Sequence, residues 1–196
     1  MYRRINAAGA VIRKKFLWIT GSTKRLNWSD TEYPLWLTYY FGFSLHQVRE
    51  PLPTSEIFNS DTKAITSGPI LPVLISHHSV IELGQNEFLL IGGHQDGKIS
   101  NNTWKVQIEN NFNFLFSKGP NMVEKRAKHS CAKMKINGSI YVVAVGGYHR
   151  KSIELLNISH ANGQNWFKGN AYLKSYTYIK NKIFLKKSSL FRSFPT

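Results

Sequence analysis

Short apolar runs that end at turn residues recur along much of the chain, and they predict β-strands. The run SIYVVAV at Ser139–Val145 is rich in β-branched and aromatic residues, which favour strands. It is continuously apolar, which indicates a strand that is buried on both faces. Asn137-Gly138 separates it from the run HSCAKMKI, and this dipeptide strongly predicts a β-hairpin, because a type I′ turn needs positive φ at both central residues. Since the local signals all indicate strands and turns, the sequence predicts an all-β fold.

The strand pattern repeats with a period close to fifty residues. A glycine pair follows an apolar run at Gly92-Gly93 and again at Gly146-Gly147, with an offset of 54. The Gly-Pro at Gly119-Pro120 has an earlier counterpart in SGPILP, with an offset of 51. The two clear copies read HSVIEL, EFLLIGG, NTWKVQIEN, FNFLFS and then HSCAKMKI, SIYVVAVGG, RKSIELLNIS, NWFKG. Each copy therefore predicts four antiparallel strands, which is the content of one propeller blade.

A third, weaker copy lies upstream. KFLWITGS, at Lys15–Ser22, predicts an apolar strand that ends at a single glycine, and TSEIFNSDTKAITSGPILP supplies the second half. An aromatic-rich insert at about 26–51 separates the two halves and matches nothing in the other copies. The predicted organisation is a basic N-terminal tail at 1–14, repeats at 15–173 (a degenerate blade at 15–72 and blades at 73–122 and 123–173), and a basic C-terminal tail at 174–196.

Taken together, these features resemble the Kelch repeat. The features are a glycine pair after an apolar strand, a histidine-serine pair that opens the first strand, a later tryptophan and the period near fifty. The resemblance implies a β-propeller that acts as a protein-binding platform, often the substrate-recognition part of ubiquitin-ligase or cytoskeletal proteins. A closed propeller needs about four to eight blades, whereas this chain supplies two to three. We therefore expect a partial Kelch-type β-propeller with irregular basic tails, belonging to a longer propeller or completed by self-association.

Architectural roles are expected for four glycines and two tryptophans: Gly92, Gly93, Gly146, Gly147, Trp104 and Trp166. A residue without Cβ lets the backbone turn sharply at the end of a crowded strand. A phosphate-binding role would need a helix after the glycines, whereas a turn and a strand follow them. The tryptophans are expected to pack within the blades, and an exposed binding hot spot is the alternative.

Three residues are candidates for contact with a partner protein: Arg126, His94 and His149. Arg126, with Lys125 and Lys128, lies in a connection between blades, where a basic loop could bind an acidic peptide. The two histidines closely follow the glycine pairs and are expected on equivalent turns of adjacent blades. A polar turn that faces solvent and a metal rim are both alternatives for them.

The sequence offers few signs of catalysis. His129 and Cys131 alternate to the same side of a predicted strand, so a Cys-His pair is geometrically allowed, and a buried structural cysteine is the alternative. Paired carboxylates, a nucleophile elbow and zinc-ligand spacing are not recognisable. We therefore predict a non-enzymatic protein–protein interaction module, with no catalytic residue, cofactor or metal.

The formal charge of +15 is concentrated at the two ends of the chain. Residues 1–26 and 168–196 each carry seven Lys or Arg and no acid, whereas residues 27–167 carry twelve basic and eleven acidic residues. A specific nucleic-acid groove would need basic side chains along the folded surface. The repeats do not predict one, so binding of nucleic acid or an anionic membrane through the basic termini is the alternative function.

Compartment signals are weak. The single cysteine, Cys131, excludes an internal disulfide and fits a reducing compartment. The most apolar window, PLWLTYYFGFSL, is about twelve residues long, whereas a membrane-spanning helix needs roughly twenty. The N-terminal apolar run is short for a secretory signal. We therefore expect no transmembrane segment and an intracellular, cytoplasmic location.

Overall fold

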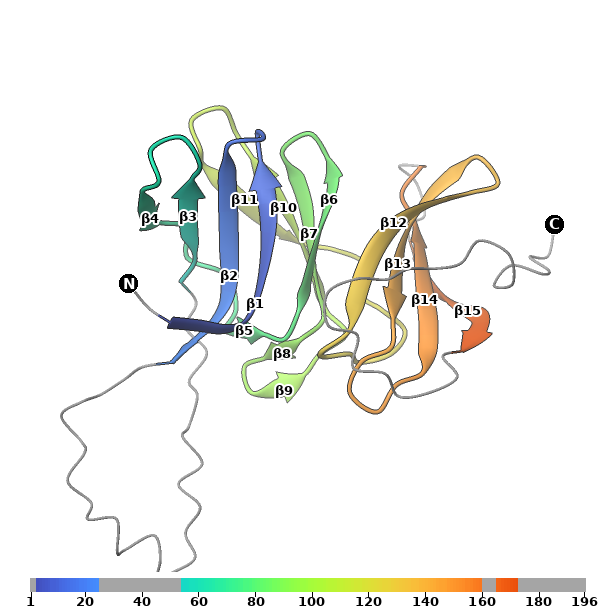
Figure 1. Cartoon of the computed structure of the whole chain (residues 1–196). Coiled ribbons are helices and arrows are strands. Elements are labelled where there is room, and N and C mark those ends of the chain that lie inside the picture. Colours follow the sequence, from blue (N-terminus) through green and yellow to red (C-terminus); the bar gives the residue numbers. More distant parts are fainter. Residues whose placement is uncertain (1–2, 25–53, 160–164, 173–196) are drawn as a thin grey trace, which may run out of the picture.

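The computed structural model describes residues 3–24, 54–159 and 165–172, and these residues form strands and no helix (Figure 1). The first four-stranded sheet contains β1 (Arg3–Ile12), β2 (Phe16–Lys24), β3 (Glu56–Asn59) and β4 (Ile65–Ser67). The second contains β6 (Ser79–Gly84), β7 (Glu87–Ile91), β10 (Thr103–Ile108) and β11 (Phe114–Lys118). The third contains β12 (Ser130–Ile136), β13 (Ser139–Val145), β14 (Ser152–Asn157) and β15 (Trp166–Tyr172). A small three-stranded sheet joins β5 (Ile75–Ser76), β8 (His94–Gln95) and β9 (Lys98–Ile99).

The prediction of an all-β fold with four-stranded antiparallel, blade-like sheets is confirmed. In each large sheet the neighbouring strands are antiparallel and, apart from the small hairpin between β7 and β10, consecutive along the chain. The hairpin between β12 and β13 turns at Asn137 and Gly138, whose φ angles of 48° and 84° are both positive, as predicted. No helix in the described ranges has the length and apolar character needed to cross a membrane.

The predicted boundary at residue 14, between a basic N-terminal tail and the repeats, is corrected by the structure. Residues 3–12 of the supposed basic tail form β1, which pairs with β2 throughout its length apart from a register shift between Ile5 and Ala8. Exposure alternates at the end of the strand, where Ile12 is fully buried and Val11 is exposed, as in a half-buried strand. The charge of Arg3 and Arg4 concealed this strand signal. The aromatic insert at 26–51 and the C-terminal tail at 174–196 lie outside the described residues.

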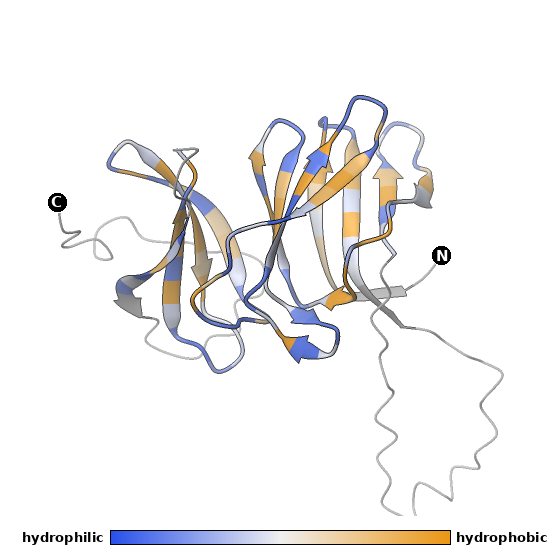
Figure 2. Ribbon diagram, turned by 180° about the vertical axis from the view of Figure 1, so that it is seen from behind, coloured by the Kyte–Doolittle hydropathy of each residue, from blue (hydrophilic) through white to orange (hydrophobic). Residues whose placement is uncertain are grey.

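Two apolar layers join the three large sheets. Between the first and second sheets, the fully buried Trp18 lies with its ring centroid 6.4 Å from Phe88 and 5.3 Å from Phe114. Between the second and third sheets, Leu89 and Val142 belong to a second buried cluster. The first strand of each large sheet lies nearest to the neighbouring sheet: β6 contacts both β1 and β12. Figure 2 shows this distribution, with apolar residues along the strands and hydrophilic residues in the loops.

The connections separate into two ends of the molecule, because consecutive antiparallel strands reverse direction at every turn. The turns of β1–β2, β3–β4, β6–β7, β10–β11 and β12–β13 share one end, here called the hairpin end (Figure 1). The connecting-loop end holds the chain segments 68–78, 92–102, 119–129 and 146–151, together with the small sheet. In such folds, loops carried on a rigid scaffold are the usual place for binding residues.

Candidate functional site

The glycine pairs direct the chain from the central strands β7 and β13 into the connecting-loop end. Gly92 and Gly93 have φ of 58° and 85°, and Gly146 and Gly147 have φ of 68° and 119°. A Cβ on Gly93 would lie 2.5 Å from the carbonyl oxygen of Ser76, so the neighbouring connection leaves no room for a side chain. The glycines therefore hold the loops close together.

A buried arginine fastens the connection between the second and third sheets. Arg126 is 0% exposed, and its Nε donates to a carboxylate oxygen of Glu154, itself 0% exposed, at 2.9 Å. The remaining guanidinium nitrogens donate to the carbonyl oxygens of Gly146 and Ser152 at 2.7 and 2.9 Å, and to the Ser152 hydroxyl and the Glu124 carboxylate. The pair is thus both neutralised and fully hydrogen-bonded, which is the condition for burying charge in an interior.

The two carboxylates of this network are engaged by several donors. Glu154 also accepts hydrogen bonds from the backbone N–H groups of Val123 and Glu124, at 2.7 and 3.0 Å. Glu124 accepts from Lys168 and Ser152, and these hydrogen bonds, with the charge of Arg126, lower its pKa to about 2. The network therefore clamps the connecting segment 122–129 onto the third sheet.

The prediction that Arg126 contacts a partner is corrected by its burial. Sequence reasoning placed it on a solvated loop because its neighbours Lys125 and Lys128 are basic, and both of those are indeed exposed. The overlooked signal is Glu154, a lone carboxylate within SIELLN, whose residues Ser152–Leu156 are all buried. An acid in such a strand requires a partner, and Arg126 is that partner.

His94 and His149 lie at the connecting-loop end, each just after a glycine pair. The partly buried His94 ring contacts His77 with centroids 5.2 Å apart, and burial together with the positive charge of Lys128 lowers its pKa. The exposed His149 ring lies 4.0 Å from that of Tyr148, over which the Lys128 ammonium sits at 5.6 Å. These five residues, His77, His94, Lys128, Tyr148 and His149, form a continuous ridge across two adjacent sheets, here called the His94–Tyr148 ridge.

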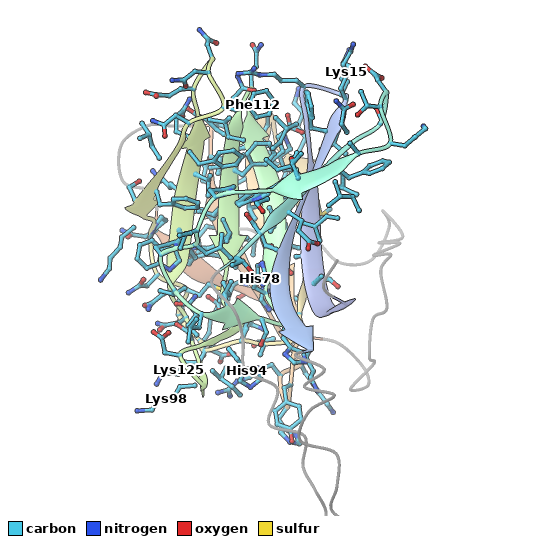
Figure 3. The ribbon with its side chains drawn as sticks, turned by 90° about the vertical axis from the view of Figure 1, so that its left-hand side faces the viewer. Lys15, His78, His94, Lys98, Phe112 and Lys125 are labelled. Carbon is cyan, nitrogen blue, oxygen red and sulfur yellow. The ribbon has the colours of Figure 1, made fainter. Side chains whose placement is uncertain are left out.

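Exposed basic side chains surround the ridge. Lys98, Lys125 and Arg150 are exposed at the same end, and Figure 3 shows Lys98, Lys125 and His94 close to one another there. Two acids lie at the same end. One oxygen of Asp96 accepts the backbone N–H of Leu74 at 3.3 Å, and Glu124 pairs with Arg126 and Lys168 and lies 3.9 Å from the Nε of Arg150. The surface therefore presents excess positive charge beside aromatic rings.

Two further histidines, each at the start of a first strand, lie in the interior. His78 and His129, which precede β6 and β12, are 6% and 7% exposed, and burial is the main cause that lowers the pKa of each to about 3. The His78 Nε2 is 2.7 Å from the Thr20 hydroxyl, which links the second sheet to the first. Burial also raises the pKa of the Cys131 thiol to about 12. At neutral pH Cys131 is thus a protonated thiol, which is a poor nucleophile.

The tryptophans occupy the layers between sheets. Trp166 is 5% exposed and belongs to the cluster between the second and third sheets, whereas the partly buried Trp104 packs against the cluster between the first and second. In the described ranges, no group of three or more His, Cys, Asp or Glu side chains is placed to hold a metal ion. None of the known protein-family models matches the chain, and a search of curated proteins likewise gives no match.

Proposed function

We propose that the protein is a non-enzymatic protein-interaction module of Kelch type, and that its partner binds at the connecting-loop end. The observation that carries the proposal is the His94–Tyr148 ridge, which is assembled from loops of two neighbouring blade-like sheets. The buried Arg126 network and the glycine turns support these loops from beneath. A rigid scaffold with a chemically varied loop surface suits recognition, because little conformational freedom is lost on binding.

Site-specific crosslinking in the full-length chain tests the location of this surface. A photoreactive phenylalanine analogue at Tyr148, which is 49% exposed at the connecting-loop end, is compared with the same group at Ile140, which is 43% exposed next to the β12–β13 turn. We expect a discrete protein adduct from position 148 and none from position 140.

Two outcomes would contradict the proposal. Equal adduct yields from the two positions would show that the connecting-loop end is not the binding surface. Adducts with nucleic acid in place of protein, lost steeply with added salt, would favour the alternative function of the basic termini. The two positions are similarly exposed, so accessibility alone does not predict a difference between them.

A further inference from the structure

The His94–Tyr148 ridge has a chemistry that selects among partners. All five of its residues carry a group that can donate to an anion: three imidazoles, one ammonium and one phenol. Its members adjoin one another, because the rings of His77 and His94 are in contact, the Lys128 N–H donates to the His77 carbonyl oxygen at 2.9 Å, and the Lys128 ammonium lies over Tyr148. A carboxylate that binds at the ridge would meet imidazole, ammonium and phenol donors from neighbouring connections.

The backbone holds these donors in place before any ligand arrives. His77, Lys128 and His149 have φ of 55°, 57° and 55°, a conformation that non-glycine residues seldom adopt. Hydrogen bonds maintain it: the Lys128 N–H donates to the His77 carbonyl oxygen at 2.9 Å, and the Tyr148 N–H donates to the Ala127 carbonyl oxygen at 2.8 Å. Residues kept in such conformations by their surroundings are found at binding sites, where preorganisation reduces the entropy lost on binding.

The charge around the ridge favours an anionic ligand of modest size. Lys98 and Lys125 are exposed beside the ridge, and Arg150 is exposed with its Nε 3.9 Å from the Glu124 carboxylate. With Lys128, these four cations outnumber the two carboxylates at this end, those of Asp96 and Glu124. The ridge consists of five residues from the four connections 68–78, 92–102, 119–129 and 146–151, and its imidazole and phenol groups make directional hydrogen bonds. Carboxylates on an extended chain fit this arrangement better than a nucleic-acid backbone or a lipid surface, both of which need a longer basic track.

We propose that the His94–Tyr148 ridge binds an acidic segment of the partner protein, and that His94 makes this binding tighter in mild acid. This inference rests on the proposed function and specifies its ligand chemistry. The titratable and charged groups near His94 are His77, whose ring it contacts, and Lys128, whose charge acts on it, from the two connections between sheets; Asp96 and Lys98 lie in the same β8–β9 hairpin. A carboxylate beside His94 opposes the effect of Lys128 and favours the imidazolium, so a proton is taken up on binding.

A fluorescent hexaglutamate peptide is the probe for the test, with hexaglutamine as its neutral counterpart. Replacing Lys125 and Lys128 together with glutamine should weaken hexaglutamate binding by a factor of about three to ten, the effect expected for two partly exposed ion pairs. The matched control replaces Lys63 and Lys133, which are exposed elsewhere, with glutamine and removes the same charge. That control should bind as the parent protein does. Equal weakening in both double variants would overturn the proposal, because it would show that only net charge matters.

The pH dependence gives a second readout. Glutamate side chains remain ionised between pH 7.5 and 6, so tighter binding over that range must come from the protein. We expect tightening of about two- to fivefold for one histidine contact, and its loss in His94→Gln. A His94→Gln variant that keeps the tightening would overturn the role of His94.

Two further probes separate this proposal from the proposed function. A single-stranded oligonucleotide or a phosphatidylserine vesicle that binds more tightly than hexaglutamate, with the same loss in the Lys125/Lys128 variant, would overturn the peptide assignment. If crosslinking from position 148 succeeds while hexaglutamate binds no better than hexaglutamine, the acidic-segment proposal fails and the proposed function stands. If crosslinking fails while hexaglutamate binds at the ridge, the proposed function is contradicted, whereas binding of carboxylates at the ridge is not.

Discussion

Among single residues, Arg126 shows most clearly how a charged side chain becomes part of the interior. Its guanidinium is 0% exposed, and every one of its nitrogens donates to a carboxylate, a hydroxyl or a carbonyl oxygen. Removal of either member of such a pair leaves a charge that is neither solvated nor neutralised. We therefore expect Arg126 to govern stability directly and partner binding only through the position of its loop.

Arg126→Met should lower the free energy of unfolding by about 3–5 kcal/mol, because it leaves the buried Glu154 carboxylate without its cation. Denaturant titration of the full chain measures this loss. In a double-mutant cycle with Glu154→Leu, the loss of stability in the double variant should be smaller than the sum of the two single losses by about 1–3 kcal/mol, since the partners share one network. Lys125→Met, at an exposed neighbouring position, is the control and should change stability by less than about 0.5 kcal/mol. Additive losses in the cycle would show that the two side chains are not coupled.

A second prediction about stability compares Gly→Ala substitutions at two positions with similar backbone angles. Gly93 and Gly97 have φ of 85° and 79°, but a Cβ on Gly93 would meet the Ser76 carbonyl oxygen at 2.5 Å, whereas a Cβ on Gly97 would have no atom within 4 Å. Gly97→Ala should therefore cost only the conformational penalty of about 1–2 kcal/mol. Gly93→Ala adds a backbone clash and should cost more than about 3 kcal/mol. Thermal unfolding of both variants gives the comparison, and equal costs would contradict the packing argument.

At the scale of strands and sheets, periodicity and turn chemistry were sufficient for most of the fold. Each strand expected in the two clear repeats is present, and Asn137-Gly138 forms the predicted turn. Four strands were not predicted, because their signals in the sequence are weak. β1 contains mostly small residues and few large apolar ones, so its strand pattern is faint. β5, β8 and β9 have only two residues each and depend on contacts between distant loops. Tertiary pairing of this kind leaves no periodic trace in a sequence.

The first sheet depends on β2 for its attachment to the second. Trp18 is 0% exposed and is surrounded by Phe88, Phe114 and Phe116 of the second sheet, with ring centroids 5.3–6.4 Å away. Trp18→Ala should destabilise the protein by about 3–5 kcal/mol, through lost burial and the cavity that remains. Leu17→Ala, at the adjacent position that is 37% exposed, should cost about 1 kcal/mol or less.

Hydrogen exchange distinguishes local from global effects of Trp18→Ala. If the first sheet is attached mainly through this tryptophan, amides of β1 and β2 should lose protection before those of β13 and β14. Uniform loss of protection over all three sheets would instead show that they unfold as a single unit, and would contradict the separate attachment of the first sheet.

For the whole molecule, the candidate surface was predictable in location but not in composition. The repeats placed His94 and His149 after equivalent turns, and both lie at the connecting-loop end. Sequence reasoning also assigned Arg126 there, because a buried arginine and a solvated one look alike without knowledge of the partner strand. Tyr148 and His77 were overlooked, since their contacts with Lys128 and His94 arise only when the connections of two sheets meet. The same meeting of sheets buries the two histidines that determine how the molecule responds to acid.

Acid should destabilise the whole molecule in a defined range of pH. His78 and His129 have pKa values of about 3 in the folded protein, whereas an unfolded chain has histidine pKa values near 6.5. The unfolded state therefore binds more protons between these values, so stability is complete above pH 6.5 and falls as the pH decreases towards 3. Each histidine should contribute a loss of about 3 kcal/mol by pH 4. Glu124, with a pKa of about 2, adds its own loss only below about pH 4.5, where an unfolded glutamate begins to protonate.

The range from pH 6.5 to 4.5 thus separates the histidines from the carboxylates, and unfolding in urea at several pH values across it measures their effect. His94, whose pKa is also lowered, adds a further contribution in this range. Neither ring nitrogen of His129 has a hydrogen-bond partner in the described structure, so His129→Leu removes a titrating group without removing a hydrogen bond. This variant should lose a large part of the pH dependence, and the double variant with His78→Leu should lose most of it, with the contribution of His94 remaining. Exposed His149→Leu is the control and should retain the parental slope. A slope unchanged in the double variant would mean that carboxylates, and not the buried histidines that join the sheets, cause the acid sensitivity.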